Sequence, residues 1–340
     1  MIIIVSLALL VASAFITRQL VMNSHRFSQM DIPNERSSHF TPTPRGGGLS
    51  FVATSIVGFL LLTLNSTIDR ADLLALCCAG IIVAIAGHLD DRQKISGATI
   101  RLGFHALGAI ILIVGIGFPS QISLFDRTID TGIIGSILGV LYLVWLLNLF
   151  NFMDGTDGIA AIEAIFVCIA GAILNYHVLS DINFSAPSII LATSTFGFLL
   201  YNWEPAKIFM GDIGSGYLGI AIGGLSLMAA KQQHELLWVW IILLAVFVSD
   251  ATVTLIRRLL RKQKPHVAHR SHAYQHLAIR FNSHSKVALI VLSINVVWLL
   301  PIASLVANKQ LAGTTGVVVA YIPLLLAALI LNAGKDSVTN

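Results

Sequence analysis

Charged residues are scarce in this sequence. Only 11% of its 340 residues are Asp, Glu, Lys or Arg, whereas 56% are hydrophobic. A water-soluble domain carries about 25% charged residues, because its surface must be hydrated. The composition therefore excludes an ordinary soluble protein. We expect a lipid bilayer around this chain, and no nucleic acid as a partner.

Cysteine is also rare. Cys77, Cys78 and Cys168 lie inside apolar runs, without the C-x-x-C spacing that is typical of zinc sites. This pattern argues against a disulfide framework and favours small buried side chains. A cleavable signal peptide is not expected either, because Arg18 follows the first apolar run and no basic residue precedes it. We interpret that run as a first membrane span.

Apolar stretches recur along the whole chain, and about eleven of them suit a hydrocarbon core of roughly 30 Å. They cover approximately Ile2–Leu20, Gly47–Leu64, Leu73–His88, Leu102–Phe118, Gly132–Leu149, Ile159–Tyr176, Ser188–Leu200, Tyr217–Ala230, Leu236–Ile256, Val287–Val306 and Val317–Leu331. No internal repeat or linker divides them. The sequence predicts an all-α, polytopic integral membrane protein with a single domain over residues 1–340. The alternating segment Ser120–Thr131 indicates either an external hairpin or an ordinary loop.

The basic residues predict the orientation in the membrane, because basic loops stay in the cytoplasm. With the N-terminus outside, all Lys and Arg residues fall on the cytoplasmic side except Arg70, Arg127, Lys231 and Lys309. The opposite orientation would reverse this strong bias. We therefore expect cytoplasmic loops to carry the active site.

Five carboxylates lie at the cytoplasmic ends of predicted spans: Asp90, Asp91, Asp154, Asp157 and Asp212. The first two follow an apolar run directly. On its own, such a pair is equally consistent with solvation at the membrane interface beside Arg92 and Lys94.

The stretch NLFNFMDGTDG, from Asn148 to Gly158, combines two amides, two carboxylates and two glycines at a span boundary. Glycine lets a ligand approach the backbone, and amide and carboxylate oxygens suit a hard cation. The helix expected to begin near Ile159 would direct its first amides at a phosphate. A simple helix cap would explain Asp157, but it would not explain Asn151.

Two further stretches carry related chemistry. FMGDIGSG, from Phe209, repeats the carboxylate in a glycine-rich turn, although a loop-to-helix cap would look similar. The basic loop from Arg257 to Lys286 contains His266, His269, Arg270, His272 and His276. Its first part suits anionic lipid head groups, and its histidines and arginine suit phosphate oxygens. A histidine metal site is disfavoured, because Mg2+ prefers oxygen ligands.

The motifs PNERSSH, PTPRGGG, HLDD, NLFNFMDGTDG, FMGDIGSG and HRSHAYQ occur in this order between the predicted spans. Together they resemble the polyprenyl-phosphate N-acetylhexosamine-1-phosphate transferases, the superfamily of phospho-MurNAc-pentapeptide translocase. The resemblance implies a UDP-amino sugar and undecaprenyl phosphate as substrates, and Mg2+ as cofactor, with Mn2+ as a substitute. It also implies the bacterial inner membrane, with an active site that opens to the cytoplasm. A homodimer is an open alternative.

The resemblance also implies roles for single residues. Asp212 would be the principal Mg2+ ligand and Asn151 a second one. Asp90 and Asp91 would lie near the lipid phosphate. Catalytic roles would belong to the five acids, Asp90, Asp91, Asp154, Asp157 and Asp212. The implied contacts with substrate are Asn148 and Asn151, with Asp157 and Phe209 at the nucleotide, His269, Arg270 and His272 at the diphosphate or sugar, and either Lys94 or Arg101 as the cation after the acidic pair.

HRSHAYQ departs from the P-x-H-H-H form of the peptidoglycan enzyme. The chain therefore looks more similar to the branch that initiates O-antigen, lipopolysaccharide or related surface polysaccharides. The expected reaction is attack of the lipid phosphate on the β-phosphorus of the donor, with UMP leaving in one step; a two-step route through an aspartyl phosphate is the rival. A transporter or flippase of lipid-linked sugars is the alternative function, because it would share the apolar composition.

Overall fold

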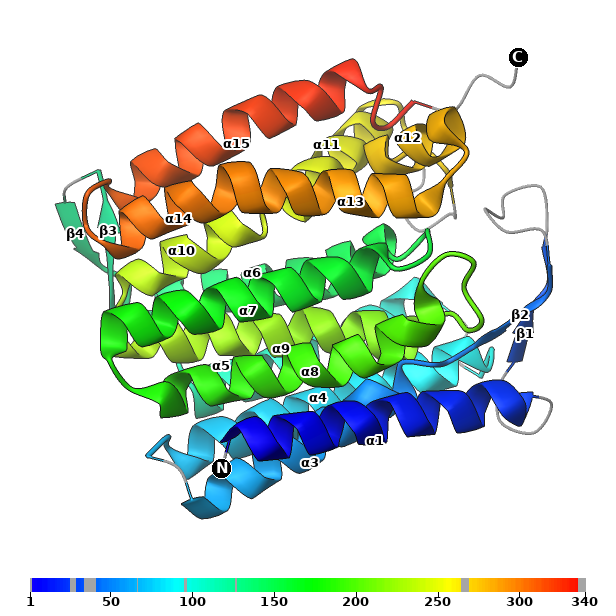
Figure 1. Cartoon of the computed structure of the whole chain (residues 1–340). Coiled ribbons are helices and arrows are strands. Elements are labelled where there is room, and N and C mark those ends of the chain that lie inside the picture. The colour runs from blue at the N-terminus through cyan, green and yellow to red at the C-terminus, as the bar shows by residue number, and fades with distance from the viewer. Residues whose placement is uncertain are drawn as a thin grey trace.

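Apolar helices dominate the computed structural model of the chain, and most of them run roughly side by side (Figure 1). The structure describes residues 2–24, 29–33, 41–65, 67–94, 97–125, 127–263 and 269–335. The helices of the first half are α1 (Ile2–Met22), α3 (Leu49–Asn65), α4 (Arg70–Asp91), α5 (Ala98–Gly115), α6 (Gly132–Met153) and α7 (Ile159–Leu179). Those of the second half are α8 (Ala186–Asn202), α9 (Asp212–Gln232), α10 (Glu235–Leu243), α11 (Ala245–Leu260), α12 (Ala273–Phe281), α13 (His284–Ile294), α14 (Leu300–Ala307) and α15 (Gly313–Ile330).

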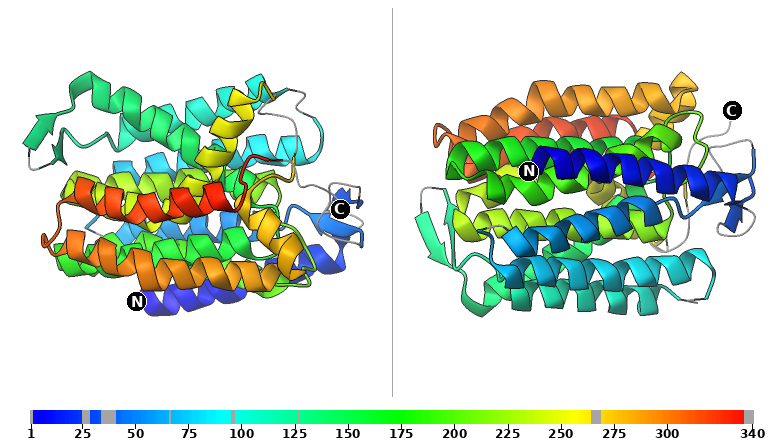
Figure 2. Two further views of the ribbon diagram at one scale, coloured as in Figure 1. Left: turned by 90° about the horizontal axis from the view of Figure 1, so that it is seen from above. Right: turned by 60° about the horizontal axis from the view of Figure 1, so that its bottom comes forward.

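Short irregular turns and strands complete the described chain. A 3-10 turn, η1 (Ile182–Ser185), leads into α8, and a π-helical turn, η2 (Asn295–Leu299), joins α13 to α14. Two antiparallel ribbons pair β1 (Gln29–Asp31) with β2 (Thr43–Arg45), and β3 (Gln121–Leu124) with β4 (Arg127–Asp130). They lie at opposite ends of the bundle (Figures 1 and 2). Of the two alternatives for Ser120–Thr131, the hairpin is correct.

The prediction of a polytopic membrane protein is confirmed. Nine helices in the described part of the chain are long and apolar enough to cross a membrane, and the bent pair of α10 and α11 makes a tenth. The shorter apolar helix α3 matches the second predicted span. Each predicted apolar stretch therefore corresponds to helix.

One predicted span is bent. Within Leu236–Ile256 the chain bends by 69° between α10 and α11. Neither proline nor glycine lies at the bend, so the sequence carried no breaking residue there. After the bend, α11 packs against α12 and α15 at the loop-bearing end of the bundle.

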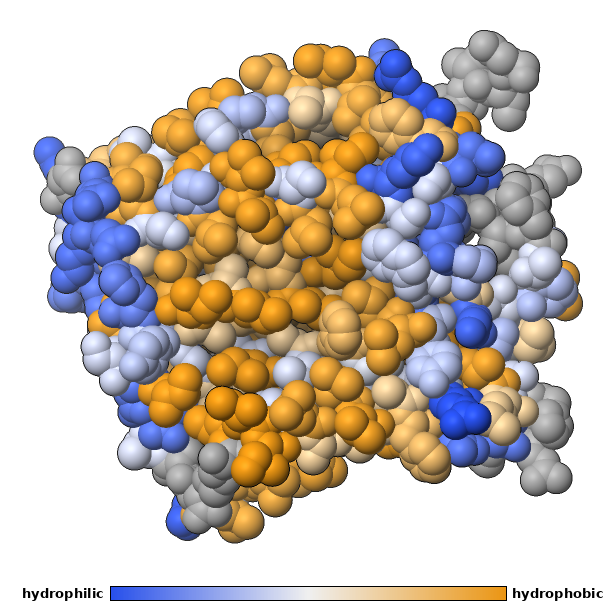
Figure 3. Space-filling view, viewed as in Figure 1, coloured by the Kyte–Doolittle hydropathy of each residue, from blue (hydrophilic) through white to orange (hydrophobic). Residues whose placement is uncertain are grey.

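On the face shown in Figure 3, a broad apolar belt lies between two more hydrophilic ends. Many large apolar side chains of the helices are exposed, for example Val114 (81%), Ile133 (79%) and Val297 (75%). Hydrocarbon solvates such side chains, whereas water would not. This surface and the apolar helices together define a multi-pass membrane protein.

Helix α9 occupies the centre of the bundle. Its apolar window is entirely buried, and it packs against α4 and α6. Glycines let the helices approach closely: a Cβ atom on Gly219 would collide with the backbone of Leu146 and Leu147 in α6. Asp212, the first residue of α9, is thereby placed at the middle of one end of the molecule.

Candidate active site

The acidic motifs converge at the end of the bundle that also carries β1 and β2 (Figure 1). Asp90 and Asp91 end α4, and Asp212 begins the neighbouring α9. Asp154 directly follows α6 and interacts electrostatically with Asp91 and Asp212. The structure thus brings these four predicted acids together.

Asp91 fixes the start of α9. Its Oδ1 accepts a hydrogen bond from the backbone N–H of Asp212 (2.9 Å), and its Oδ2 accepts one from Ile213 (3.1 Å). The Nε atom of Arg45 lies 2.9 Å from Oδ1. A carboxylate in this place satisfies amides that have no partner inside the helix. Gly211 is needed just before it, because its φ is 77° and a Cβ atom would strike the Asp91 carboxylate.

Asp212 is held from three sides. Its Oδ1 accepts hydrogen bonds from Arg45 Nη2 (2.5 Å) and Asn151 Nδ2 (3.0 Å), and Arg101 Nη1 lies 3.7 Å from its Oδ2. Asn151 also donates to Ser215 Oγ (3.2 Å). In this structure Asn151 therefore orients Asp212 through its amide nitrogen, and the predicted role as a metal ligand would use its amide oxygen.

Backbone pairing brings Arg45 into the site. Phe209 N–H donates to the carbonyl of Pro44 (2.8 Å), which aligns the end of β2 with the segment that leads into α9. The next turn is equally close: Gly48 N–H donates to Met210 O, and a Cβ atom on Gly48 would collide with the backbone of α9. The glycines of PTPRGGG therefore let two backbone segments meet.

A first cavity, of about 250 Å³, opens beside Asp90 and Asp212. Its other polar lining residues are Arg101, His105, Asn148 and Asn151. Arg101 Nη1 is 2.9 Å from Asp90 Oδ2. Of the two cations that the sequence left open, Arg101 is the one in this cavity, whereas Lys94 lies exposed beyond the end of α4.

Asp154 is half-buried, and Asn148 is bonded to its own helix. Burial raises the pKa of Asp154 well above its usual value, although Arg45 pulls it down. The neutral carboxyl form is therefore favoured. Asn148 donates from Nδ2 to the carbonyl of Val144 in its own helix (2.7 Å) while it lines the first cavity.

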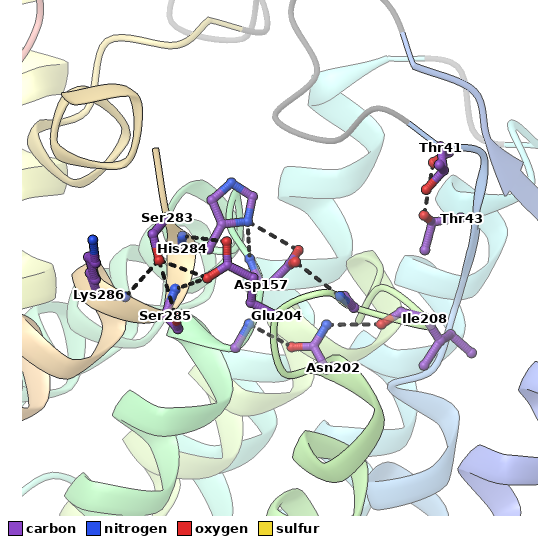
Figure 4. Close-up of polar contacts among 12 residues, drawn as sticks. Thr41, Thr43, Asp157, Asn202, Glu204, Ile208, Ser283, His284, Ser285 and Lys286 are labelled. Carbon is purple, nitrogen blue, oxygen red and sulfur yellow. Dashed lines mark hydrogen bonds and ion pairs between the residues drawn. The ribbon is translucent and has the colours of Figure 1, made fainter. Parts of the chain in front are cut away.

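A second cavity, of about 500 Å³, accommodates other predicted residues. Asp157, Phe209 and Arg270 line it. The Oδ2 atom of Asp157 accepts a hydrogen bond from the backbone N–H of Ala206 (3.0 Å), as Figure 4 shows. Asp157 therefore borders a different cavity from Asp90.

The basic loop is organised by Asp250 of α11. Its carboxylate accepts hydrogen bonds from the backbone N–H groups of Ala273 and Tyr274, each at 3.0 Å, and contacts His272 Nδ1 at 3.2 Å. The ring of His272 stacks on that of His269, with 5.1 Å between centroids. This arrangement caps α12.

The predicted basic residues therefore lie in different surroundings. Arg270 lines the second cavity, whereas His272 is only 3% exposed and supports the loop from inside. His269 stacks on His272 and lines neither of the two cavities. Residues 264–268, including His266, and residues 34–40 of the PNERSSH motif lie outside the described residues.

Three cavity residues were missed by the sequence analysis. His105 lines the first cavity, and Glu204 and His284 line the second. Ser283 before α13 is an ordinary helix N-cap signal, and it could have marked the start of that helix. No local pattern, however, connects Glu204 with a segment so far along the chain.

Oxygen donors for a divalent cation are available where Asp90 and Asp212 meet. The two carboxyl groups interact electrostatically, and a cation between them would offset the repulsion of their negative charges. Mg2+ favours hard oxygen ligands and commonly takes one or two carboxylates, completed by water and substrate phosphates. Within the described ranges, no group of three His, Cys, Asp or Glu side chains could enclose a metal. The residues thus fit an ion shared with a phosphate-bearing ligand, and not a closed structural site.

Comparison with known proteins agrees with this arrangement. Residues 73–230 match the model of glycosyl transferase family 4. The chain is 29% identical over 271 residues to a probable undecaprenyl-phosphate N-acetylglucosaminyl 1-phosphate transferase of Bacillus subtilis, covering 78% of this chain and 74% of that protein. It is 27% identical over 316 residues to the decaprenyl-phosphate N-acetylglucosaminephosphotransferase of Mycobacterium leprae, covering 84% and 79%.

A third relative is a phospho-N-acetylmuramoyl-pentapeptide-transferase of Nautilia profundicola, 27% identical over 252 residues, covering 66% of this chain and 68% of that protein. The family match spans α4 to α9, the helices that supply the converging acids. Over most of its length the chain is therefore similar to polyprenyl-phosphate hexosamine-1-phosphate transferases, and residues 73–230 are similar to glycosyl transferase family 4.

Proposed function

We propose that this protein transfers an N-acetylhexosamine 1-phosphate from a UDP-sugar to a polyprenyl phosphate and releases UMP. The observation that carries the proposal is the cluster of Asp90, Asp91 and Asp212, crossed by Arg45 and Arg101, at one end of a membrane bundle. Both substrates are anions, so cations must offset their repulsion. The names of the three relatives describe the same class of reaction.

The reaction needs little proton chemistry. A phosphate oxygen of the lipid attacks the β-phosphorus of the donor, and the bond from that phosphorus to the oxygen of UMP breaks. The second pKa of a phosphate monoester is about 6, so the lipid phosphate is largely a dianion at neutral pH. Positioning and electrostatics therefore dominate.

Asp90 is the acid that meets the lipid phosphate in this proposal. It lines the first cavity, and Arg101 beside it supplies the positive charge that draws the phosphate in. Asp91 has both oxygens on the backbone of α9, so it positions Asp212 and does not contact substrate.

Mg2+ would be held by Asp212 and Asp90, with Asn151 orienting Asp212. When bound, the ion would neutralise charge that develops on the phosphates of the donor. Arg45 keeps Asp212 aimed at this place through the hydrogen bond to its Oδ1.

The second cavity would take the nucleoside end of the donor. Its volume lies within the roughly 300–1,000 Å³ of ordinary ligand pockets. Phe209 offers an aromatic face, Asp157 a carboxylate, and Arg270 a cation for the diphosphate.

The finer assignment is supported by the HRSHAYQ stretch, which differs from the P-x-H-H-H form of the peptidoglycan enzyme. We expect undecaprenyl phosphate as acceptor, N-acetylglucosamine or a related amino sugar in the donor, and a place at the start of O-antigen or another surface polysaccharide. The inner membrane, with a cytoplasmic site and an external N-terminus, suits a reaction that consumes a cytoplasmic nucleotide sugar.

A direct assay tests the proposal. Purified protein is incubated with undecaprenyl phosphate, Mg2+ and a panel of UDP-amino sugars, and UMP release and lipid-linked product are measured. We expect both products from at least one donor, and none without the lipid. Movement of lipid-linked sugar across vesicles without UMP release would instead favour the transporter. Fast exchange of labelled UMP into the donor without lipid would overturn the one-step route.

A further inference from the structure

Three loops that are distant in sequence meet at one wall of the second cavity (Figure 4). The turn before α7 contributes Asp157, the segment between α8 and α9 contributes Glu204, and the start of α13 contributes His284. Asn202 ties the first two together, because it accepts a hydrogen bond from Gly158 N–H (3.1 Å) and donates to Ile208 O (2.9 Å). This wall is therefore a built feature of the fold.

Glu204 fixes the position of α13. Its carboxylate accepts hydrogen bonds from the backbone N–H groups of His284 (3.0 Å) and Ser285 (2.7 Å), and from the hydroxyl of Ser283 (2.9 Å). Burial alone would raise the pKa of Glu204, but these bonds outweigh it and lower the pKa to about 2. The carboxylate thus stays charged at any working pH, and His284 stays in place.

Asp157 then sets which ring nitrogen of His284 is available. The backbone N–H of Asp157 donates to Nδ1 at 3.3 Å, and from this bond we assign Nδ1 as the acceptor and the ring proton to Nε2. The carboxylate of Asp157 lies 3.4 Å from the same Nδ1. Among the residues that the structure describes, none hydrogen-bonds Nε2, and His284 lines the cavity. The cavity wall therefore presents an N–H donor.

We propose that His284 is a specificity-determining residue that donates a hydrogen bond from Nε2 to the carbonyl at ring position 4 of the uracil base, and that Glu204 and Asp157 are its positioning residues. This inference rests on the proposed function, because it takes the second cavity to be the nucleoside site. Neither Glu204 nor His284 belongs to the motifs on which the resemblance to the family rests.

The chemistry of the base makes this donor selective. Uracil carries a carbonyl acceptor at ring position 4, where cytosine carries an amino donor. A fixed N–H donor can bond the carbonyl of uracil, but it faces another donor in the amino group of cytosine. A site built to form a hydrogen bond rejects a ligand that cannot form it. His284 should therefore favour uridine nucleotides over cytidine nucleotides.

Equilibrium binding of UMP and CMP to the purified full-length protein, with Mg2+ present, tests the inference. The wild type should bind UMP more tightly. His284→Ala should weaken UMP binding by roughly tenfold, the usual effect of one hydrogen bond, with little effect on CMP. His284→Gln carries an amide N–H near the position of Nε2 and should keep the preference. His177→Ala, a histidine bonded to Asn308 and away from the cavity, is the matched control.

Glu204→Gln provides a second route if the His284 variants fold poorly. Gln cannot accept from all three donors, so His284 should shift, the UMP-to-CMP preference should fall, and KM for the UDP-sugar should rise more than kcat falls. A lower thermal midpoint with an unchanged preference would show that Glu204 is structural only, and would overturn its positioning role.

The outcomes separate this inference from the proposed function. A wild type that binds neither nucleotide overturns both. A wild type that binds UMP and forms lipid-linked product, while His284→Ala keeps the full UMP-to-CMP preference, overturns the role of His284 alone.

Discussion

Asp90 and Asp91 are neighbours in sequence with different surroundings. Asp91→Asn removes a charged acceptor of two backbone N–H groups at the start of α9. We expect it to lower the free energy of unfolding by about 1–3 kcal/mol, and to reduce activity because Asp212 moves. Asp90→Asn should abolish most turnover while the thermal midpoint stays near that of the wild type.

Thermal midpoints in detergent and UMP release measure this contrast. Lys94→Ala is the control, because Lys94 is exposed beyond the first cavity, and it should retain activity. Equal losses of stability in the Asp90 and Asp91 variants would contradict the division of roles.

Asp212 is the acid on which the site depends. Asp212→Ala should reduce turnover by about a thousandfold, the scale of losing a principal electrostatic contact in an active site, while the protein still inserts into the membrane. Cys77→Ala, a small change in the buried core, should scarcely affect the rate. Comparable rates for the Asp212 variant and the wild type would refute the assignment.

The raised pKa of Asp154 predicts that the stability of the folded protein depends on pH. Its raised pKa means that the folded protein keeps a proton that the unfolded chain releases near pH 4. Because the native state then binds more protons, this group makes stability fall as pH rises above about 4, until the folded-state pKa is passed. Asp154→Asn should remove that slope, which thermal midpoints between pH 5 and pH 8 would reveal. An unchanged slope in the variant would contradict the raised pKa.

At the scale of elements, Asp250 joins α11 to the start of α12. Asp250→Ala removes the acceptor of the Ala273 and Tyr274 N–H groups, so hydrogen exchange at these two amides should accelerate. Ser304→Ala in α14 removes a hydroxyl bonded only within its own helix and should leave α12 unchanged. Unaltered exchange in the Asp250 variant would show that the start of α12 is stable without the Asp250 carboxylate.

The helices could be predicted from sequence because the bilayer demands long apolar segments, and each predicted stretch is helical. The bend between α10 and α11 could not, since neither glycine nor proline marks it. Its cause is tertiary: α11 packs against α12 and α15, at the end where Asp250 caps α12. Local sequence patterns do not predict such a contact.

The site was predictable only where it follows a motif. Three acidic turns were recognised, two because a carboxylate is combined with nearby glycines and HLDD because two carboxylates directly follow an apolar run. Their division between two cavities, and the helix-capping role of Asp91, depend on which helices pack together. Glu204 and His284 were missed because one is an isolated acid and the other an isolated histidine, and only the fold brings them together.

At the scale of the whole molecule, the two hydrophilic ends predict a topology. We expect the β3–β4 hairpin to face outside and the converging acids to face the cytoplasm. Single cysteines at Thr128 and Arg92, in a variant whose three native cysteines are replaced by alanine, would report this through a membrane-impermeant thiol reagent. In intact cells, only the Thr128→Cys variant should react. Reaction of Arg92→Cys alone would reverse the orientation.

The central claim is that the protein transfers a phosphate together with its sugar. Donor UDP-N-acetylglucosamine with radioactive phosphorus at the β-position tests this most directly. With undecaprenyl phosphate and Mg2+, the label should pass to the lipid while an equal amount of unlabelled UMP is released. Label that stays with released UDP, or that appears as inorganic phosphate, would contradict the transfer of a sugar 1-phosphate.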